Sequence, residues 1–260
     1  AAAGAVPIGI QVVLILPENI TEDDIANLMD EINKTAKDIN VEILGGHTEI
    51  LSAVNKPIIV VTAVGKIPHN RIISSAGAKP GDDLVLTKGA GIEGTYILAS
   101  DYSDLLIKNN IDKDIIKRAQ CYCEKISVIK EGIIAAKMGA HAMHDVTEGG
   151  LYGAMEELAH AGGNGFELFF NKIPVCKETA EICNKLNIDP TGLISSGSML
   201  IAIAETESER LINKLDTENI ASVKIGKVTK NKKYIIKNGK KTTFNWSKRD
   251  ELWSLMEHKP

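Results

Sequence analysis

Hydrophobic and polar residues alternate along the first third of the chain in a pattern that predicts a strand, a helix and two further strands. Between the first two strands, Thr21 and Asp24 form a capping-box start, and apolar residues follow at the spacing of an amphipathic helix. The strands are predicted from runs rich in β-branched and other apolar residues: IGIQVVLIL at 8–16, VEIL at 41–44 and PIIVVTAVG at 57–65.

A turn signal at Pro80-Gly81 marks a change in the pattern. We place a domain boundary between Lys79 and Asp82, which gives an N-terminal domain of 1–80 and a C-terminal domain of 81–260. The C-terminal domain starts with a short strand, and a glycine-rich loop then leads into a helix.

The rest of the C-terminal domain is predicted to alternate between strands and helices. Asn238-Gly239 is a strong hairpin signal, and a short helix containing Trp253 and Met256 closes the chain. The other predicted strands lie near 84–87, 140–146, 165–170, 198–204 and 221–229, and the other helices near 112–125, 127–138, 148–161, 177–186 and 206–215.

Composition and charge narrow the class of protein. A chain of 260 residues with 44% hydrophobic content can bury a substantial core. Its 30 basic and 34 acidic side chains give a net charge of −4, which excludes a global cationic field for nucleic acid or anionic lipid and favours a small polar ligand. No apolar stretch approaches the roughly 20 residues that cross a bilayer. We therefore expect a cytoplasmic protein with no membrane segment.

Two residue types are interpreted as structural. The four cysteines lack the spacing of a zinc site, so we expect reduced, buried or half-buried thiols. Eight lysines lie between Lys224 and Lys241, and few aromatic residues are interleaved with them. A solvated β face is therefore expected there, and a nucleic-acid surface is not.

Three glycine-bearing stretches interrupt the regular pattern. In GGHTE (45–49), the glycines allow a close approach to the main chain, and the next three residues supply an imidazole, a hydroxyl and a carboxylate, a set suited to phosphate and magnesium. The alternative is a tight turn whose polar side chains satisfy the backbone.

The stretch TKGAGIEGT (87–95) follows a strand and precedes a helix, where free amide groups bind anions and Lys88 adds a positive charge. It matches no complete phosphate-loop motif, and an ordinary strand-to-helix turn is the alternative.

The stretch MHDVTEGGL (143–151) offers ordinary helix capping by Asp145 or Thr147. Capping gives less reason for two glycines in the first turn, each of which costs roughly 1 kcal/mol relative to alanine. A ligand close to the backbone would explain them.

Together with LISSGSML (193–200), these stretches occur in an order and spacing that resemble a known family. From its first residues to about residue 230, the chain is similar to the aminoimidazole ribonucleotide (AIR) synthase-related proteins. This family includes the purine-pathway synthase, the hydrogenase maturation factor HypE, selenophosphate synthetase and thiamine-monophosphate kinase.

The resemblance implies an α+β protein with the two-domain, PurM-like fold. N-terminal sheets of two subunits would pair into a shared β-barrel, giving a homodimer, and the C-terminal domain would be an α/β layer on a mostly antiparallel sheet. ATP and Mg²⁺ would bind between the domains, and the γ-phosphate would pass to a small-molecule or carrier-bound substrate. The similarity to HypE also implies a maturation partner protein.

The resemblance assigns roles to individual residues. His47 and Asp145 become candidate catalytic residues, and Glu49 and Asp145 become candidate metal ligands. The implied nucleotide- or phosphate-binding residues are Gly45, Gly46, Thr48, Lys88, Gly89, Gly91, Gly94, Thr95, Thr147, Gly149 and Gly150.

Several departures from the family pattern limit this assignment. His47 stands where HypE and the thiamine kinase have an acid, and Glu148 replaces an arginine of HypE. The chain ends in MEHKP, without the Pro-Arg-Ile-Cys tail of HypE, so cyanide-ligand synthesis by that route is not expected. The opening AAAGAVP resembles the segment just after the family's Asn-Asp metal-binding element, so we expect a fragment of a longer protein whose remaining ATP and metal ligands lie outside this sequence.

An ATP-dependent phosphotransfer enzyme is the leading hypothesis. The alternative is a non-catalytic nucleotide sensor or maturation scaffold that keeps the fold but has lost the acid at His47. Thiamine-phosphate kinase activity is weakened by the same histidine and by the absence of that enzyme's nearby acidic motif.

Overall fold

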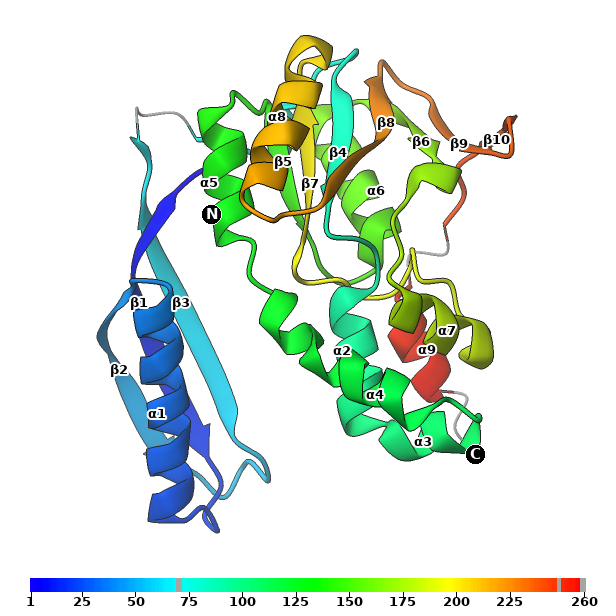
Figure 1. Cartoon of the computed structure of the whole chain (residues 1–260). Helices are drawn as coiled ribbons and strands as arrows, with labels where there is room; N and C mark the ends of the chain where they lie inside the picture. Colours follow the sequence, from blue (N-terminus) through cyan, green and yellow to red (C-terminus); the bar gives the residue numbers. More distant parts are fainter. Residues whose placement is uncertain (69–71, 247–248, 258–260) are drawn as a thin grey trace. The chain divides into compact units, whose positions relative to one another are not determined.

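The structure, a computed structural model, describes residues 1–68, 72–246 and 249–257 (Figure 1). The chain divides into two compact units, one formed by Ala5–Arg71 and the other by Ala1–Gly4 together with Ile72–Pro260. The sequence-based boundary between domains 1–80 and 81–260 stays a proposal. His69 and His258 lie outside the described residues.

The smaller unit is a three-stranded sheet with one helix. Its strand β1 is central, parallel to β2 and antiparallel to β3. This arrangement confirms the predicted order of strand, helix, strand, strand, although β2 continues well past the predicted VEIL segment. The four elements are β1 (Val6–Leu16), α1 (Glu22–Asp38), β2 (Glu42–Ile50) and β3 (Ile58–Lys66).

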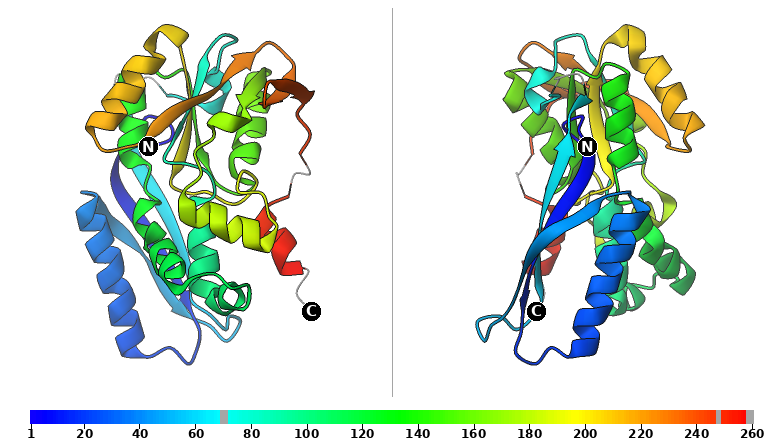
Figure 2. Two further views of the ribbon diagram at one scale, coloured as in Figure 1. Left: turned by 45° about the vertical axis from the view of Figure 1, so that its right-hand side comes forward. Right: turned by 90° about the vertical axis from the view of Figure 1, so that its left-hand side faces the viewer.

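One face of β1 packs against α1, as Figure 2 shows. Val12, Leu14 and Leu16 are buried on this face because they alternate along the strand and meet the apolar side of the helix. The predicted capping box starts α1: the Thr21 side chain accepts from the Asp24 amide, and the Asp24 side chain accepts from the Thr21 amide. The cap therefore provides partners for two amide groups at the start of the helix.

The strand β3 carries an uncovered apolar surface. All nine of its residues are exposed, and its large aliphatic side chains keep between 41% and 52% of their surface accessible. Exposed apolar patches of this kind mark interaction surfaces in soluble proteins. The exposed aliphatic residues of β3 are Ile58, Ile59, Val60, Val61 and Val64.

The larger unit is built on a seven-stranded sheet with the order β10-β9-β6-β8-β4-β7-β5. Its neighbouring strands are antiparallel except for β6 and β9, which confirms the mostly antiparallel sheet. The strands are β4 (Asp83–Thr87), β5 (Ala142–Val146), β6 (Gly165–Phe169), β7 (Ser198–Ile203), β8 (Ser222–Thr229), β9 (Lys233–Lys237) and β10 (Lys240–Thr243).

Helices of the larger unit form three apolar clusters. Residues of α6 pack on one face of the sheet and residues of α5 and α8 on the other, which Figure 2 also shows. A third cluster joins α2, α3, α4, α7 and α9. The helices are α2 (Ile92–Asp101), α3 (Ser103–Lys108), α4 (Lys113–Gln120), α5 (Ile129–Lys137), α6 (Gly150–Gly162), α7 (Lys177–Leu186), α8 (Glu205–Thr217) and α9 (Glu251–Glu257).

Most predicted elements of this unit are confirmed, and the differences are local. The helix predicted at 112–125 is divided into α4 and a 3-10 turn at Cys121–Lys125, and α3 was not predicted. Cys121 and Cys123 are exposed on that turn, so the expectation of buried or half-buried thiols is wrong for these two residues. Asn238 and Gly239 both have positive φ between β9 and β10, which confirms the hairpin.

Replacing the cap of α1 tests the local energetics of the smaller unit. Thr21→Ala removes a side chain that accepts from the Asp24 amide, and we expect the free energy of unfolding to fall by about 1 kcal/mol. Urea denaturation measures this loss. The matched control is Thr35→Ala in the interior of the same helix, which should be neutral or slightly stabilising. Equal losses in both variants would contradict the role of the cap.

Candidate functional site

The segment GGHTE lies inside β2 and does not form the tight turn considered from the sequence. The pairing of β1 with β2 shifts by one residue at Leu44, and Gly45 next to this bulge has a φ of 148°. A side chain at Gly46 would place its Cβ 1.8 Å from the Val12 carbonyl oxygen. The two glycines are therefore required by strand geometry, whether or not a ligand binds.

Strand alternation separates the three polar side chains of GGHTE. His47 pairs with Val13 and Glu49 with Ile15, so both point to the face opposite α1, whereas Thr48 points to the α1 face. The imidazole, the hydroxyl and the carboxylate were expected to face the same ligand. This expectation is wrong for Thr48, because its hydroxyl lies on the other face of the sheet.

The imidazole and the carboxylate of this segment do meet. His47 Nε2 lies 3.1 Å from Glu49 Oε2, and the two side chains are 67% and 50% exposed. An exposed carboxylate held beside an imidazole keeps oxygen lone pairs available to a cation or a ligand proton.

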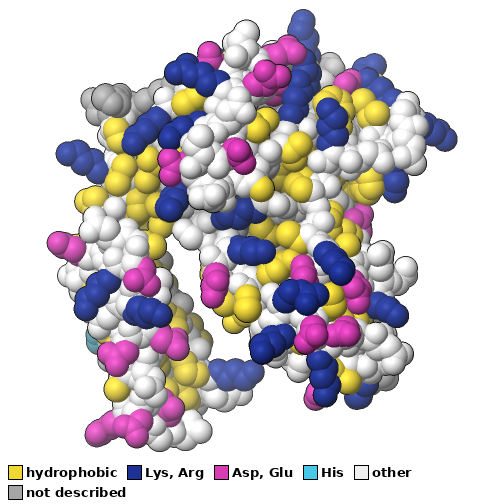
Figure 3. Space-filling model, viewed as in Figure 1, with side chains coloured by type: hydrophobic (Ala, Val, Ile, Leu, Met, Phe, Trp, Pro, Cys, Tyr) yellow, Lys and Arg dark blue, Asp and Glu magenta, His cyan; other side chains and the backbone are white. Residues whose placement is uncertain are grey.

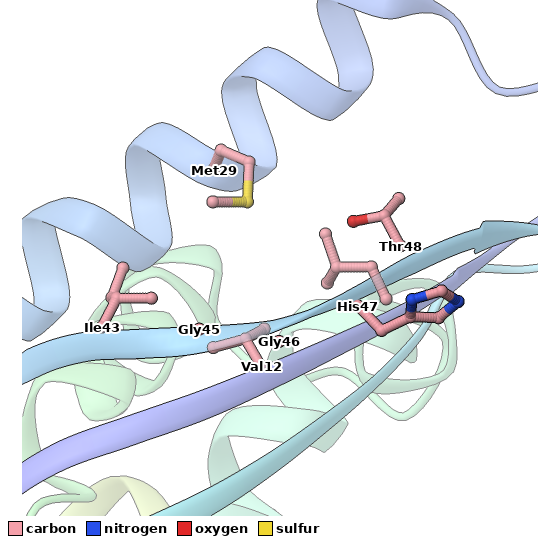
Figure 4. A pocket seen from close by; sticks show the side chains of 8 residues that line it. Val12, Met29, Ile43, Gly45, Gly46, His47 and Thr48 are labelled. Atoms are coloured by element: carbon pink, nitrogen blue, oxygen red, sulfur yellow. The ribbon is translucent and has the colours of Figure 1, made fainter.

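A groove of about 320 Å³ lies between α1 and β2. Figure 4 shows Met29 extending from α1 toward the sheet and Thr48 on the helix side of β2, with the His47 ring directed away from the helix. Gly45 lines the groove, and nothing lies within 4 Å of the place where its Cβ would stand. Among the predicted binding glycines, Gly45 thus offers open space beside its backbone.

The loop TKGAGIEGT is buried and fully packed where it joins β4 to α2. Six of its amide groups donate to acceptors of the protein, so the structure does not support the predicted anion cradle. A strand-to-helix turn, the alternative considered from the sequence, accounts for it. The pairs are Lys88 N with Ala221 O, Gly89 N with Thr87 O, Ala90 N with Pro174 O, Ile92 N with Ser195 Oγ, Gly94 N with Ile194 O, and Thr95 N with Gly91 O.

Side chains of this loop also have internal partners. The Lys88 ammonium donates to three carbonyl oxygens and pairs with Glu131 Oε1 at 2.6 Å. Thr95 is buried and donates to Gly91 O. Gly94 is needed because a Cβ there would lie 2.4 Å from Leu193. Phosphate contacts by these residues are therefore unsupported.

The glycines of MHDVTEGGL are explained by packing within the protein. A Cβ at Gly149 would lie 2.6 Å from the Trp246 ring, and a Cβ at Gly150 would lie 2.6 Å from the Leu193 carbonyl oxygen. Both glycines have positive φ at the start of α6. Trp246 and Leu193 therefore fill the space in which a ligand was expected.

Asp250 occupies the position predicted for a bound anion at the start of α6. Its Oδ2 accepts from the Gly149 amide at 2.6 Å, and its Oδ1 accepts from the Leu252 amide at 2.8 Å. Burial raises the pKa of this carboxyl, while donated amide hydrogen bonds act in the opposite direction. Asp250 was not among the predicted site residues, although an aspartate directly before a short apolar helix is a cap signal.

Asp145 and His144 point to opposite faces of the edge strand β5. Asp145 is exposed and pairs with Met199, on the face that packs with α5 and α8. His144 Nε2 lies 2.8 Å from Glu157 Oε2 of α6. No cluster of three or more metal-ligating side chains occurs among the described residues, so neither Glu49 nor Asp145 has a preformed metal site around it.

Several lysines of β8 to β10 form ion pairs with acidic side chains. Lys224 Nζ lies 2.8 Å from Asp83, and Lys233 Nζ lies 2.7 Å from Glu156. In the view of Figure 3, basic side chains are interspersed with acidic ones. Within the described part of the chain, no helix has the length and apolar character needed to span a bilayer.

Comparison with known proteins defines the class of protein. The N-terminal domain model of the AIR synthase related proteins matches residues 1–67, and the corresponding C-terminal domain model matches residues 79–238. The chain therefore belongs to the AIR synthase related family.

Curated relatives of the chain include hydrogenase maturation proteins. A putative hydrogenase expression/formation protein of Methanocaldococcus jannaschii is 28% identical over 212 residues, which cover 82% of this chain and 61% of that protein. Carbamoyl dehydratase HypE of Rhodobacter capsulatus is 27% identical over 210 residues, covering 80% and 59%. The chain spans about three fifths of the length of these relatives.

Solved structures share the fold. Escherichia coli HypE superposes with a TM-score of 0.81 at 22% identity, covering 98% of this chain and 78% of HypE. A HypE–HypF complex gives 0.79 at 17% identity, covering 94% and 79%. HypE in complex with ATP gives 0.76 at 19% identity, covering 94% and 76%. These likenesses confirm the predicted PurM-like α+β fold; the dimeric barrel stays a prediction.

Removing the carboxylate of Asp250 tests whether it holds the start of α6. Asp250→Ala leaves the buried Gly149 amide without its acceptor, and we expect a loss of about 1–3 kcal/mol in the free energy of unfolding. Chemical denaturation monitored by circular dichroism measures it. Asp216→Ala, on the exposed end of α8, is the matched control and should change little. An unchanged stability in Asp250→Ala would contradict the assignment.

Proposed function

We propose that the chain is part of an ATP-dependent enzyme of the AIR synthase type. With Mg²⁺, the enzyme would transfer a phosphoryl group to a small-molecule or carrier-bound substrate in hydrogenase maturation. The observation that carries the proposal is the match of both family domains, in order, to a chain whose relatives include carbamoyl dehydratases. The known complexes of HypE with ATP and with HypF support nucleotide binding and a maturation partner protein.

The residues that best fit such a reaction are exposed rather than buried. Glu49 and Asp145 carry accessible carboxylates, and Gly45 leaves its backbone open to a ligand. Magnesium prefers oxygen ligands and retains several waters, so one or two carboxylates and the phosphates of ATP suffice to hold it. When bound, the ion would neutralise charge on the transferred phosphoryl group. His47 can orient Glu49 by donating from Nε2.

A nucleotide sensor or maturation scaffold without catalysis remains the second candidate. It is favoured by the internal hydrogen bonds of the loop at 87–95 and by the occupation of the Gly149 amide by Asp250. Both observations reduce the number of groups that could stabilise a transferring phosphoryl group. Metal-dependent phosphate release in the presence of candidate substrates separates the two functions, because a scaffold binds nucleotide without turnover.

Nucleotide binding is tested by calorimetry of the full-length protein with ATP and Mg²⁺. We expect saturable binding below millimolar nucleotide. Asp145→Asn should weaken the magnesium-dependent affinity by about tenfold or more, because an oxygen ligand with full negative charge is lost. Asp216→Asn on α8 is the matched control. Absence of binding at millimolar ATP would count against the enzyme and the sensor alike, and wild-type affinity in Asp145→Asn would remove this residue from the site.

We also propose that a second copy covers the exposed sheet of the smaller unit. Val60 pairs with Val13, so it points to the face opposite α1, where a lysine would be buried by a partner sheet. Val60→Lys should convert a dimer into monomers in light scattering coupled to gel filtration. Asn33→Lys on the exposed side of α1 adds the same charge and should leave the dimer intact. A wild-type protein that is monomeric at all concentrations would refute the proposal.

A further inference from the structure

A second cavity, of about 520 Å³, lies beside the start of α6 and of α9. It is lined by Trp246 and Trp253, which are the only two tryptophans of the chain. Trp253 is 51% exposed, an unusual state for so large an apolar side chain. All the residues that line the cavity belong to the larger unit, so it is distinct from the groove between α1 and β2.

The walls of this cavity are fixed by packing and hydrogen bonds. Trp246 lies against α6 where two residues lack side chains: a Cβ at Gly149 would be 2.6 Å from its ring, and a Cβ at Gly153 would be 3.4 Å from it. Asp250 joins the start of α9 to the start of α6 through the Leu252 and Gly149 amides. The Trp246 ring is therefore packed against α6, and α9, which carries Trp253, is tied to the start of α6 through Asp250.

Acidic side chains predominate in the lining of the cavity. Four carboxylates face one basic group among the described lining residues, and that base, Arg249, is paired with Glu257. Asp250 accepts from two amides and Glu157 contacts His144. Glu148 is exposed and has no ion-pair partner in the described part of the chain. An anion would be repelled here, whereas a cation would meet both carboxylates and aromatic side chains.

We propose that this cavity, lined by Trp246, Trp253 and Glu148, binds an organic cation, a guanidinium or ammonium group. Indole faces attract such cations, and a neighbouring carboxylate adds direct charge attraction. The group could be carried by a free small molecule or by an arginine or lysine side chain of a protein. Both sources present the same chemistry to the cavity. The proposal does not depend on ATP binding and can hold or fail separately from the proposed function.

Intrinsic fluorescence reports directly on the cavity, because both tryptophans of the chain line it. The 260-residue chain is titrated with butylguanidinium and with butylurea, an uncharged molecule of the same shape. We expect a saturable fluorescence change with butylguanidinium and no such change with butylurea. N-acetyl-argininamide distinguishes the sources: tighter binding than butylguanidinium supports a protein side chain as the natural ligand, and weaker binding supports a small molecule.

Two variants test the residues that carry the inference. Glu148→Gln should weaken butylguanidinium binding by about threefold to tenfold, and Glu209→Gln on α8 is the matched control that should bind as the wild type does. In Trp253→Phe, butylguanidinium should still change the fluorescence of Trp246, and the total change should be smaller than in the wild type. Circular dichroism verifies that each variant is folded. The proposal is overturned if butylurea and butylguanidinium act alike, if neither saturates, or if Glu148→Gln binds with unchanged affinity.

Discussion

The close approach of β1 and β2 at Gly46 is the constraint on which the geometry of the smaller unit depends. Because a Cβ at this position would stand 1.8 Å from the Val12 carbonyl oxygen, the two strands can run side by side only with glycine there. The bulge before it sets the register of everything that follows in β2. His47 and Glu49 consequently project together from the face opposite α1, and Thr48 projects into the groove beneath the helix.

Glycines of the larger unit likewise allow close packing within the chain. At Gly94, Gly149 and Gly150 the missing side chains let segments of the same chain pack closely, and the amide of Gly149 is satisfied by Asp250. A glycine-rich helix start is a good anion site only when its amides are free. Here an internal carboxylate fills that position, which leaves the exposed acids Glu49 and Asp145 as the more informative candidates for ligand chemistry.

Elements whose structure depends on contacts between neighbouring residues could be predicted from the sequence alone. Thr21 with Asp24, and Asn238 with Gly239, set a helix start and a hairpin through contacts between neighbours in the chain, and both predictions are confirmed. The contacts of the glycine-rich loops could not be predicted, because the residues that they contact lie far away in the sequence. The contact of Gly149 with Trp246 and Asp250 spans about a hundred residues, and no local pattern reports it. Family resemblance supplied the fold but could not indicate which glycines pack internally.

The proposed function requires that the protein binds ATP with Mg²⁺ and that Asp145 of the larger unit takes part in this binding. Hydrogen exchange followed by mass spectrometry tests this requirement most directly, with the full-length protein in Mg²⁺ alone and with a non-hydrolysable ATP analogue added. Slower exchange is predicted in peptides that cover Asp145 when the analogue is present. Unchanged exchange in these peptides would contradict the proposal.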